Sequence, residues 1–259
     1  MSETTGGRKD IVMLSPPTEV SMGAEWFELV DLDHFWIIRR LEVLKRVFGD
    51  LLDPAWSYGE VGCGHGIVQQ QFEQTFHLSV DGLDLNLGAL STNKSSKGTL
   101  YHYDILERRP EMAGKYDCLI LFDVLEHITD QDNFLQACLH HLKPGGTLLV
   151  NVPAQMSLFS KYDEVVGHIR RYSWDELAAV AKRGGMALGR HTYWGLPFYP
   201  LLLIRKRLVA NLDASLVIKK GMDRGSPLKN KLLLLLSRLE ILPQGLTGTS
   251  LMAAFRKTT

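Results

Sequence analysis

The stretch Glu60-Val61-Gly62-Cys63-Gly64-His65-Gly66 decides the fold of this chain. It follows a short apolar run and precedes an amphipathic segment, so the glycines lie in a turn between a strand and a helix. Glycines there let backbone N–H groups approach a ligand at the helix N-terminus. The spacing differs from the Gly-x-Gly-x-x-Gly of dinucleotide-binding proteins, and an acid at position 60 suits an ammonium better than a pyrophosphate. An ordinary glycine turn is the alternative.

Short apolar runs and amphipathic segments alternate along the rest of the chain, which predicts βαβ units and a parallel sheet. Asp130 is expected to cap a helix over residues 133–142, which Pro144-Gly145-Gly146 ends. The expected strands cover residues 57–61, 79–84, 99–102, 116–122, 147–152, 186–194 and 251–257.

The flanking segments divide the chain into three expected parts. Residues 1–54 hold a polar tail, mobile up to residue 21, and two helices over residues 24–52. Residues 55–194 form the α/β core. Residues 195–259 hold an insertion, helical over residues 201–209 and 232–241, and the final strand.

Composition narrows the class of protein. The 259 residues are 45% hydrophobic, enough for one sizeable core. A net charge of +0 argues against nucleic acid as a partner. Three scattered cysteines indicate a reducing compartment, the first ten residues do not resemble a secretory signal, and no apolar run reaches the roughly 20 residues of a spanning helix. We therefore expect a cytoplasmic protein.

Acidic side chains follow several of the expected strands. Asp84 lies about 20 residues beyond the glycine loop, where a carboxylate can bind ribose hydroxyls. Asp104 follows the third strand and either binds an adenine amino group or caps the next turn. Phe122-Asp123-Val124-Leu125-Glu126-His127 ends the fourth strand with titratable groups at the carboxyl edge of the sheet, where open α/β folds bind ligands.

Taken in order, the glycine loop, Asp84, residues 122–127 and Leu142-Lys143-Pro144-Gly145-Gly146 resemble the motifs of class I S-adenosylmethionine-dependent methyltransferases. The resemblance covers residues 56–152. It implies a Rossmann-like, doubly wound sheet of seven strands, mostly parallel with one antiparallel strand, and helices on both faces. It also implies S-adenosylmethionine as cofactor and S-adenosylhomocysteine as product. The residues implied to bind the cofactor are Glu60, Gly62, Cys63, Gly64, Gly66, Asp84, Leu85, Asp104, Ile105, Phe122, Asp123 and Arg40.

Three flanking segments are similar to one bacterial branch of that superfamily. They are His34-Phe35-Trp36 with Arg40, Ser160-x-Tyr162-Asp163 followed by Gly167-His168-x-Arg170-Arg171-Tyr172, and the closing segment over residues 243–251. The first is expected to lie over the cofactor, and residues 195–259 are expected to cover the acceptor. The residues expected to contact the acceptor are Trp36, Arg171, Tyr172 and Trp194.

Methyl transfer from a sulfonium is an in-line displacement, so a base is needed only where the acceptor must lose a proton. His168 is the first candidate base and His127 the second, with Tyr162 and Asp123 as further catalytic candidates. A structural role is the alternative for each histidine. Arg170-Arg171 could clamp an anion or form ion pairs with neighbouring acids such as Asp163. No metal site is expected.

The expected function is methyl transfer to an O, N or C atom of a small-molecule or lipid-like acceptor. A cofactor-binding protein without transferase activity and a nicotinamide-dependent reductase are the alternatives. After Pro200 the chain has eleven Lys/Arg against three acids. If the apolar faces of this segment are exposed, we expect peripheral contact with anionic lipid.

Overall fold

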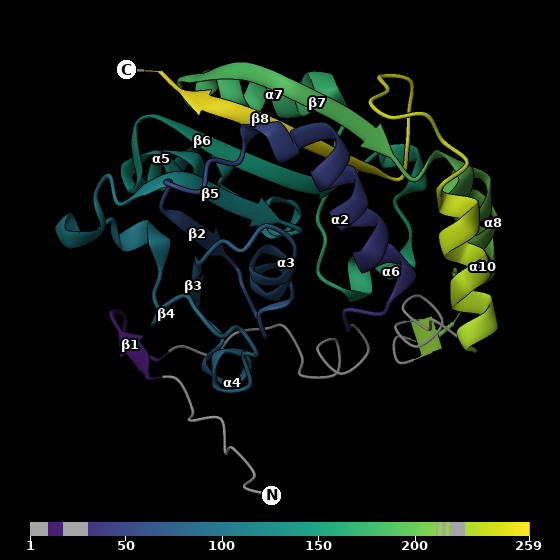
Figure 1. Cartoon of the computed structure of the whole chain (residues 1–259). Helices are drawn as coiled ribbons and strands as arrows, with labels where there is room; N and C mark the ends of the chain where they lie inside the picture. The colour runs from purple at the N-terminus through teal and green to yellow at the C-terminus, as the bar shows by residue number, and fades with distance from the viewer. Residues whose placement is uncertain (1–9, 18–30, 211, 214–215, 218–225, 259) are drawn as a thin grey trace, which may run out of the picture.

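The computed structural model describes residues 10–17, 31–210, 212–213, 216–217 and 226–258, which are built around one eight-stranded sheet (Figure 1). The strand order is β1-β4-β3-β2-β5-β6-β8-β7. The strands are β1 (Ile11–Met13), β2 (Tyr58–Val61), β3 (Val80–Asp84), β4 (Leu100–His102), β5 (Tyr116–Phe122), β6 (Leu142–Pro153), β7 (Met186–Trp194) and β8 (Ser250–Lys257).

The direction of the strands confirms the predicted fold class. Strands β1 to β6 pair in parallel, and β8 runs antiparallel to both β6 and β7, so β8 is the one antiparallel strand of the described sheet. The chain order reverses at β2, which lies between β3 and β5. In open α/β sheets this reversal is where ligands bind, at the carboxyl ends of the strands.

The predicted number of strands was wrong by one, because residues 11–13 form a strand within the tail that we expected to be mobile. Ile11 pairs with Leu100 and Met13 with His102, in register with β4. Without this segment β4 would end the sheet with unpaired backbone N–H and C=O groups, and a short apolar segment is enough to satisfy them.

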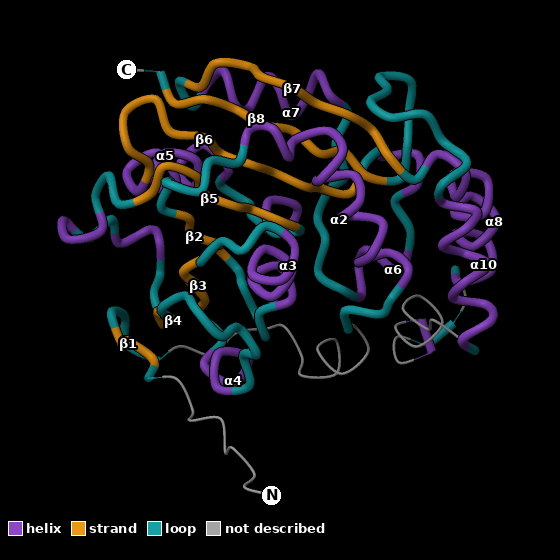
Figure 2. Tube along the Cα trace, in the orientation of Figure 1, coloured by secondary structure: helices purple, strands orange, loops and turns teal. Residues whose placement is uncertain are grey.

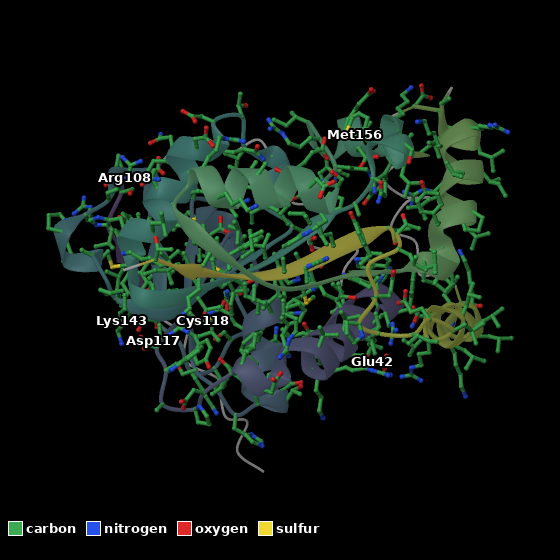
Figure 3. The ribbon with its side chains drawn as sticks, turned by 90° about the horizontal axis from the view of Figure 1, so that it is seen from above. Glu42, Arg108, Asp117, Cys118, Lys143 and Met156 are labelled. Atoms are coloured by element: carbon green, nitrogen blue, oxygen red, sulfur yellow. The ribbon has the colours of Figure 1, made fainter. Side chains whose placement is uncertain are left out.

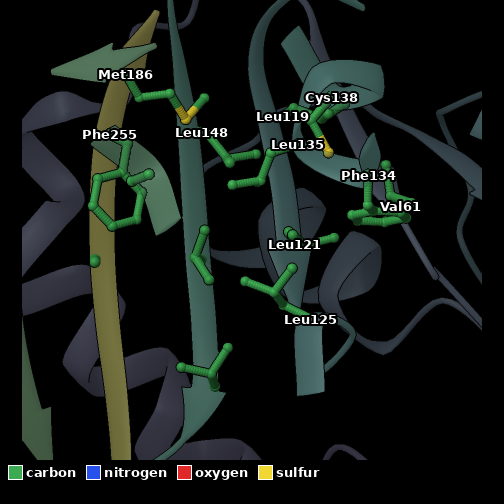
Figure 4. Close-up of a cluster of buried hydrophobic side chains, with 14 of the residues drawn as sticks. Val61, Leu119, Leu121, Leu125, Phe134, Leu135, Cys138, Leu148, Met186 and Phe255 are labelled. Atoms are coloured by element: carbon green, nitrogen blue, oxygen red, sulfur yellow. The ribbon is translucent and has the colours of Figure 1, made fainter. Parts of the chain in front are cut away.

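Helices cover both faces of the sheet (Figure 2). Alternate side chains of β5 point to opposite faces. Leu119 and Leu121 pack with helices α5 (Gln131–His141) and α7 (Trp174–Arg183), and Cys118 and Ile120 pack with α2 (Phe35–Phe48) and α3 (Ile67–Thr75). Figure 4 shows part of the first cluster. The α-helices are α2 (Phe35–Phe48), α3 (Ile67–Thr75), α4 (Leu87–Ser91), α5 (Gln131–His141), α6 (Lys161–Val165), α7 (Trp174–Arg183), α8 (Tyr199–Val209) and α10 (Pro227–Ser237).

Most predicted elements lie within a few residues of the observed ones. The Asp130 side chain caps α5 by accepting a hydrogen bond from the backbone of Asn133 at 3.1 Å, as predicted. Strand β6 begins five residues earlier than predicted, because Gly145 takes a left-handed φ of 72° and the backbone continues as a strand. The first of the two helices expected over residues 24–52 lies mostly outside the described residues, and the second is α2.

Candidate functional site

The glycine loop joins β2 to α3 at the point where the strand order reverses. Gly62, Gly64 and Gly66 have φ values of 74°, 52° and 86°, which side chains disfavour. A Cβ on Gly62 would lie 2.6 Å from Cγ2 of Val124, and one on Gly66 would lie 2.5 Å from Oδ1 of Asn93. Backbone atoms are therefore brought to this edge of the sheet at positions where only glycine fits.

Asp84, at the end of β3, is bound to this loop. Its Oδ2 accepts a hydrogen bond from the Gly64 N–H at 2.7 Å, and its Oδ1 accepts one from the Asn86 N–H at 2.7 Å. Burial raises the pKa of the Asp84 carboxyl. Gly64 and Asp84, which are 20 residues apart in the sequence, are therefore in direct contact. Leu85, the next residue, is half-buried.

Glu60 lies beneath the loop as a buried acid. Its side-chain Oε2 has no hydrogen-bond partner among the described residues, and burial raises its pKa well above the usual range. A buried carboxyl oxygen without a partner is costly unless a donor reaches it. An ammonium group would supply such a donor, which is the chemistry expected for an acid at this position.

Arg40 and Asp123 form a close ion pair next to the loop. Nη1 of Arg40 lies 2.6 Å from Oδ2 of Asp123, and its guanidinium carbon lies 5.2 Å from the centre of the Phe122 ring. Asp123 also accepts a hydrogen bond from Nδ2 of Asn151 at 2.7 Å, and Oδ1 of Asn151 accepts one from the indole N–H of Trp194 at 3.0 Å. This chain of bonds fixes Asp123, whose φ is 56°.

The two tryptophans expected to contact an acceptor pack against each other. Their ring centroids are 4.3 Å apart, and Trp194 is completely buried while Trp36 is half-buried. Asn151, which holds the Trp194 indole, was not among the predicted site residues. A polar residue in the otherwise apolar run of β6 was the signal that could have found it.

Three predicted cofactor residues are buried or form a hydrogen bond within the protein. Asp104 caps its own turn, because its Oδ1 accepts a hydrogen bond from the Leu106 N–H at 2.9 Å. That is the alternative weighed for it, although half-burial leaves its side chain partly accessible. Cys63 and Ile105 are buried, and burial raises the pKa of the Cys63 thiol well above its usual range.

His168 is held by Asp163. Nδ1 of His168 lies 3.0 Å from Oδ1 of Asp163, and the backbone N–H of Ser160 donates to Oδ2 of Asp163 at 2.9 Å. Although burial opposes ionisation, the hydrogen bond from His168 and the Arg171 charge lower the pKa of Asp163 to about 2. Because an ionised carboxylate can only accept hydrogen bonds, Nδ1 of His168 is the donor in this contact.

Arg171, expected to clamp an anionic acceptor, is buried and lies 2.7 Å from the same Asp163 oxygen. The ion pair that the sequence analysis weighed as the alternative is thus present. Tyr172 is also buried, and its hydroxyl donates to the Leu125 carbonyl at 3.0 Å. Tyr162 is buried with the Arg205 guanidinium 4.7 Å above its ring, and burial raises its pKa to about 12.

Glu126, His127 and His168 form a second cluster of titratable groups. Their ligand atoms lie within 4.8 Å of one another, close enough to converge on a cation. Neither carboxyl oxygen of Glu126 accepts a hydrogen bond from the described residues, and burial raises its pKa well above the usual range. Burial and the neighbouring His168 lower the pKa of His127 to about 4. Glu126 lies in the motif over residues 122–127, but no role was predicted for it.

A family model described as a methyltransferase domain matches residues 36–189, more than half of the chain. The ubiquinone biosynthesis O-methyltransferase of Marinobacter nauticus is 33% identical over 100 residues, which cover 36% of this chain and 42% of that protein. The match therefore spans less than half the length of this curated relative.

Solved structures share the fold. Phosphoethanolamine N-methyltransferase 2 of Haemonchus contortus, in complex with S-adenosyl-L-methionine, has a TM-score of 0.58 at 20% identity and covers 86% of this chain and 53% of that chain. The [4+2]-cyclase SpnF has a TM-score of 0.56 at 14% identity and covers 86% of this chain and 83% of that chain. At these identities the likeness concerns the fold alone.

Proposed function

The chain belongs to the methyltransferase-domain family, and on that premise we propose that it transfers a methyl group from S-adenosylmethionine to a small-molecule or lipid-like acceptor. The observation that carries the proposal is the glycine loop, which Asp84 binds through the Gly64 N–H above the partner-free oxygen of Glu60. These groups fit a ligand that has both an ammonium and a ribose.

The chain's own residues have distinct roles in holding such a cofactor. The glycine loop would lie against the amino-acid end, with the partner-free oxygen of Glu60 beneath it accepting from the ammonium group. Asp84 would accept hydrogen bonds from ribose hydroxyls, and Arg40 would face the carboxylate end. When bound, S-adenosylmethionine supplies a methyl group on a positively charged sulfur, a leaving group that needs no protonation.

His168 is the base that we propose for the acceptor. Asp163 fixes the ring through Nδ1, so Nε2 is free to take a proton, and the side chain is 15% exposed and therefore reachable. This arrangement favours an acceptor hydroxyl, which must lose a proton to attack carbon. It agrees with the O-methyltransferase named as a relative. Nε2 of His168 also lies 3.7 Å from a carboxyl oxygen of Glu126.

The test is transfer of a tritiated methyl group from S-adenosylmethionine to catechol as an O-acceptor and to phosphoethanolamine as an N-acceptor. We expect transfer to catechol and a loss of about 10²- to 10⁴-fold in turnover in His168→Gln. His140→Gln is the matched control. His140 bonds the Arg109 carbonyl and lies at the end of α5, just before β6 begins, so it is far from the carboxyl ends of the strands. Equal turnover in His168→Gln and the control would remove His168 as the base.

Measurements of cofactor binding and methyl transfer also distinguish two other functions. A protein that binds S-adenosylmethionine without transferring its methyl group would show affinity but no labelled product with either acceptor. A nicotinamide-dependent reductase would bind NADH or NADPH instead. The Glu60 carboxyl next to the glycine loop disfavours the pyrophosphate of those cofactors. No helix among the described residues is long and apolar enough to cross a membrane.

A further inference from the structure

Helix α10 carries a row of exposed leucines. Leu228, Leu232 and Leu235 follow one another at intervals of four and three residues, so they share one face of the helix, and Leu239 lies two residues beyond its end. Between 59% and 77% of each of these side chains is exposed. Ile241 and Leu246, which follow, are 83% and 82% exposed.

Helix α8 has a second apolar row. Leu201, Ile204 and Leu208 lie at intervals of three and four residues, and their side chains are 44% to 69% exposed. Figures 1 and 3 place α8 and α10 on one side of the molecule. Soluble monomers rarely expose so many large aliphatic side chains in one region, and such surfaces commonly mark contact with a protein or a membrane.

The opposite face of α10 is bound to the core. Oδ1 of Asn230 accepts a hydrogen bond from the Phe35 N–H at 2.9 Å, and its Nδ2 donates to the Asp33 carbonyl at 2.8 Å. After the helix, Arg238 bonds Glu42 of α2, a residue labelled in Figure 3. The orientation of the helix is therefore fixed, and its leucine row faces outward.

The charges on this surface are mostly positive. Arg207, Lys229 and Lys231 are exposed on the two helices. Among the described residues from 199 to 249 the acids are Asp213, which is exposed, and Glu240, which is buried and paired with Arg39 at 3.1 Å. Exposed aliphatic side chains beside lysine and arginine match a surface that is apolar inside and negative outside.

We propose that the leucine rows of α8 and α10 dock onto the surface of an anionic lipid bilayer. The leucines enter the boundary between head groups and acyl chains, and the cations contact the phosphate groups. A second copy of this chain fits less well, because a symmetric contact would bring Arg207, Lys229 and Lys231 toward their own counterparts. The inference does not depend on the proposed transfer reaction.

The same helices contact the elements that carry the candidate site. Asn230 of α10 bonds the first residue of α2, the helix that contains Arg40. Arg205 of α8 covers the Tyr162 ring, which lies next to Asp163. Docking would thus hold the candidate site close to the bilayer surface.

The experiment is sedimentation of the full chain with vesicles of phosphatidylcholine alone or with one-third phosphatidylglycerol. We expect binding to the anionic vesicles, weaker binding in high salt, and at least tenfold weaker binding for the combined variant Leu228→Ser, Leu232→Ser and Leu235→Ser. The matched control is Leu106→Ser with Leu188→Ser, two exposed leucines on other elements. Circular dichroism and affinity for S-adenosylhomocysteine check that each variant is folded.

Three results would overturn the proposal. The first is a wild-type chain that does not sediment with anionic vesicles, and the second is equal binding of the triple variant and its control to them. The third is a dimer in sedimentation velocity that the triple variant dissociates, with no binding to vesicles, which would assign the surface to a second copy. Because the assay contains neither methyl donor nor acceptor, its failure is distinguishable from failure of the proposed transfer reaction.

Discussion

Asn in place of Asp163 tests whether the buried carboxylate organises the loop after β6. The carboxyl has a pKa of about 2 in the folded chain against a usual value of 3.8, so its ionised form stabilises the fold by about 2 kcal/mol at neutral pH. We expect Asp163→Asn to lose that amount or somewhat more, because Arg171 is left buried beside a neutral side chain.

The dependence on pH gives the sharper test. A lowered carboxyl pKa stabilises the folded state fully above about pH 4, and the contribution is lost as the pH falls toward 2. We therefore expect urea unfolding of the wild type and Asp163→Asn to give a constant difference in the free energy of unfolding from pH 7 down to about pH 4. Between pH 4 and pH 3 this difference should shrink. As a control, Asp132→Asn removes an exposed ion pair with Arg183 and should cost less than about 1 kcal/mol. A variant as stable as the wild type at pH 7, or a difference that grows in acid, would refute the reasoning.

Three further predictions concern the loop and the second cluster. Gly62→Ala should abolish measurable binding of S-adenosylhomocysteine, because the new Cβ would lie 2.6 Å from Val124. In the control Gly114→Ala the new Cβ has no atom within 4 Å, so this variant should bind normally. It should lose only about 1 kcal/mol of stability, because residue 114 has a positive φ. Dialysis against EDTA should leave methyl transfer to catechol unchanged, and a loss restored by a divalent cation would assign the cluster of Glu126 and its two histidines to a metal. His127→Ala should lower turnover much less than His168→Gln does, since Nδ1 of His127 bonds the Gly167 carbonyl, and equal losses would contradict the choice of base.

The sequence was sufficient to place the core elements and the centre of the site. Strands β5 and β7 have the predicted bounds. Strand β5 is mostly apolar and is followed directly by Asp123, and β7 lies between Gly185 and Gly195. The contact between Gly64 and Asp84 follows from parallel strands that end at one edge of the sheet. These features depend on local pattern and on a topology that leaves little freedom.

Other features depend on partners far away in the chain. The three residues of β1 form a strand only because β4 offers an unpaired edge, which no local pattern reveals. The chain from Arg40 through Asp123 to Asn151 joins three segments more than 25 residues apart. From the sequence, the partner of Arg171 could be either an anionic ligand or a neighbouring acid. The fold decides for the acid, because it brings Asp163 within 2.7 Å of Arg171.

Calorimetric titration with S-adenosylhomocysteine tests the central claim most directly. The wild type should bind it, and Asp84→Asn should bind at least tenfold more weakly, because one charge-assisted hydrogen bond contributes about 1.5–3 kcal/mol. Asp81→Asn, on the same strand and bonded to the Thr99 N–H, should keep its affinity. No uptake by the wild type, or equal affinity in Asp84→Asn, would contradict the claim that the glycine loop and Asp84 form the nucleotide site.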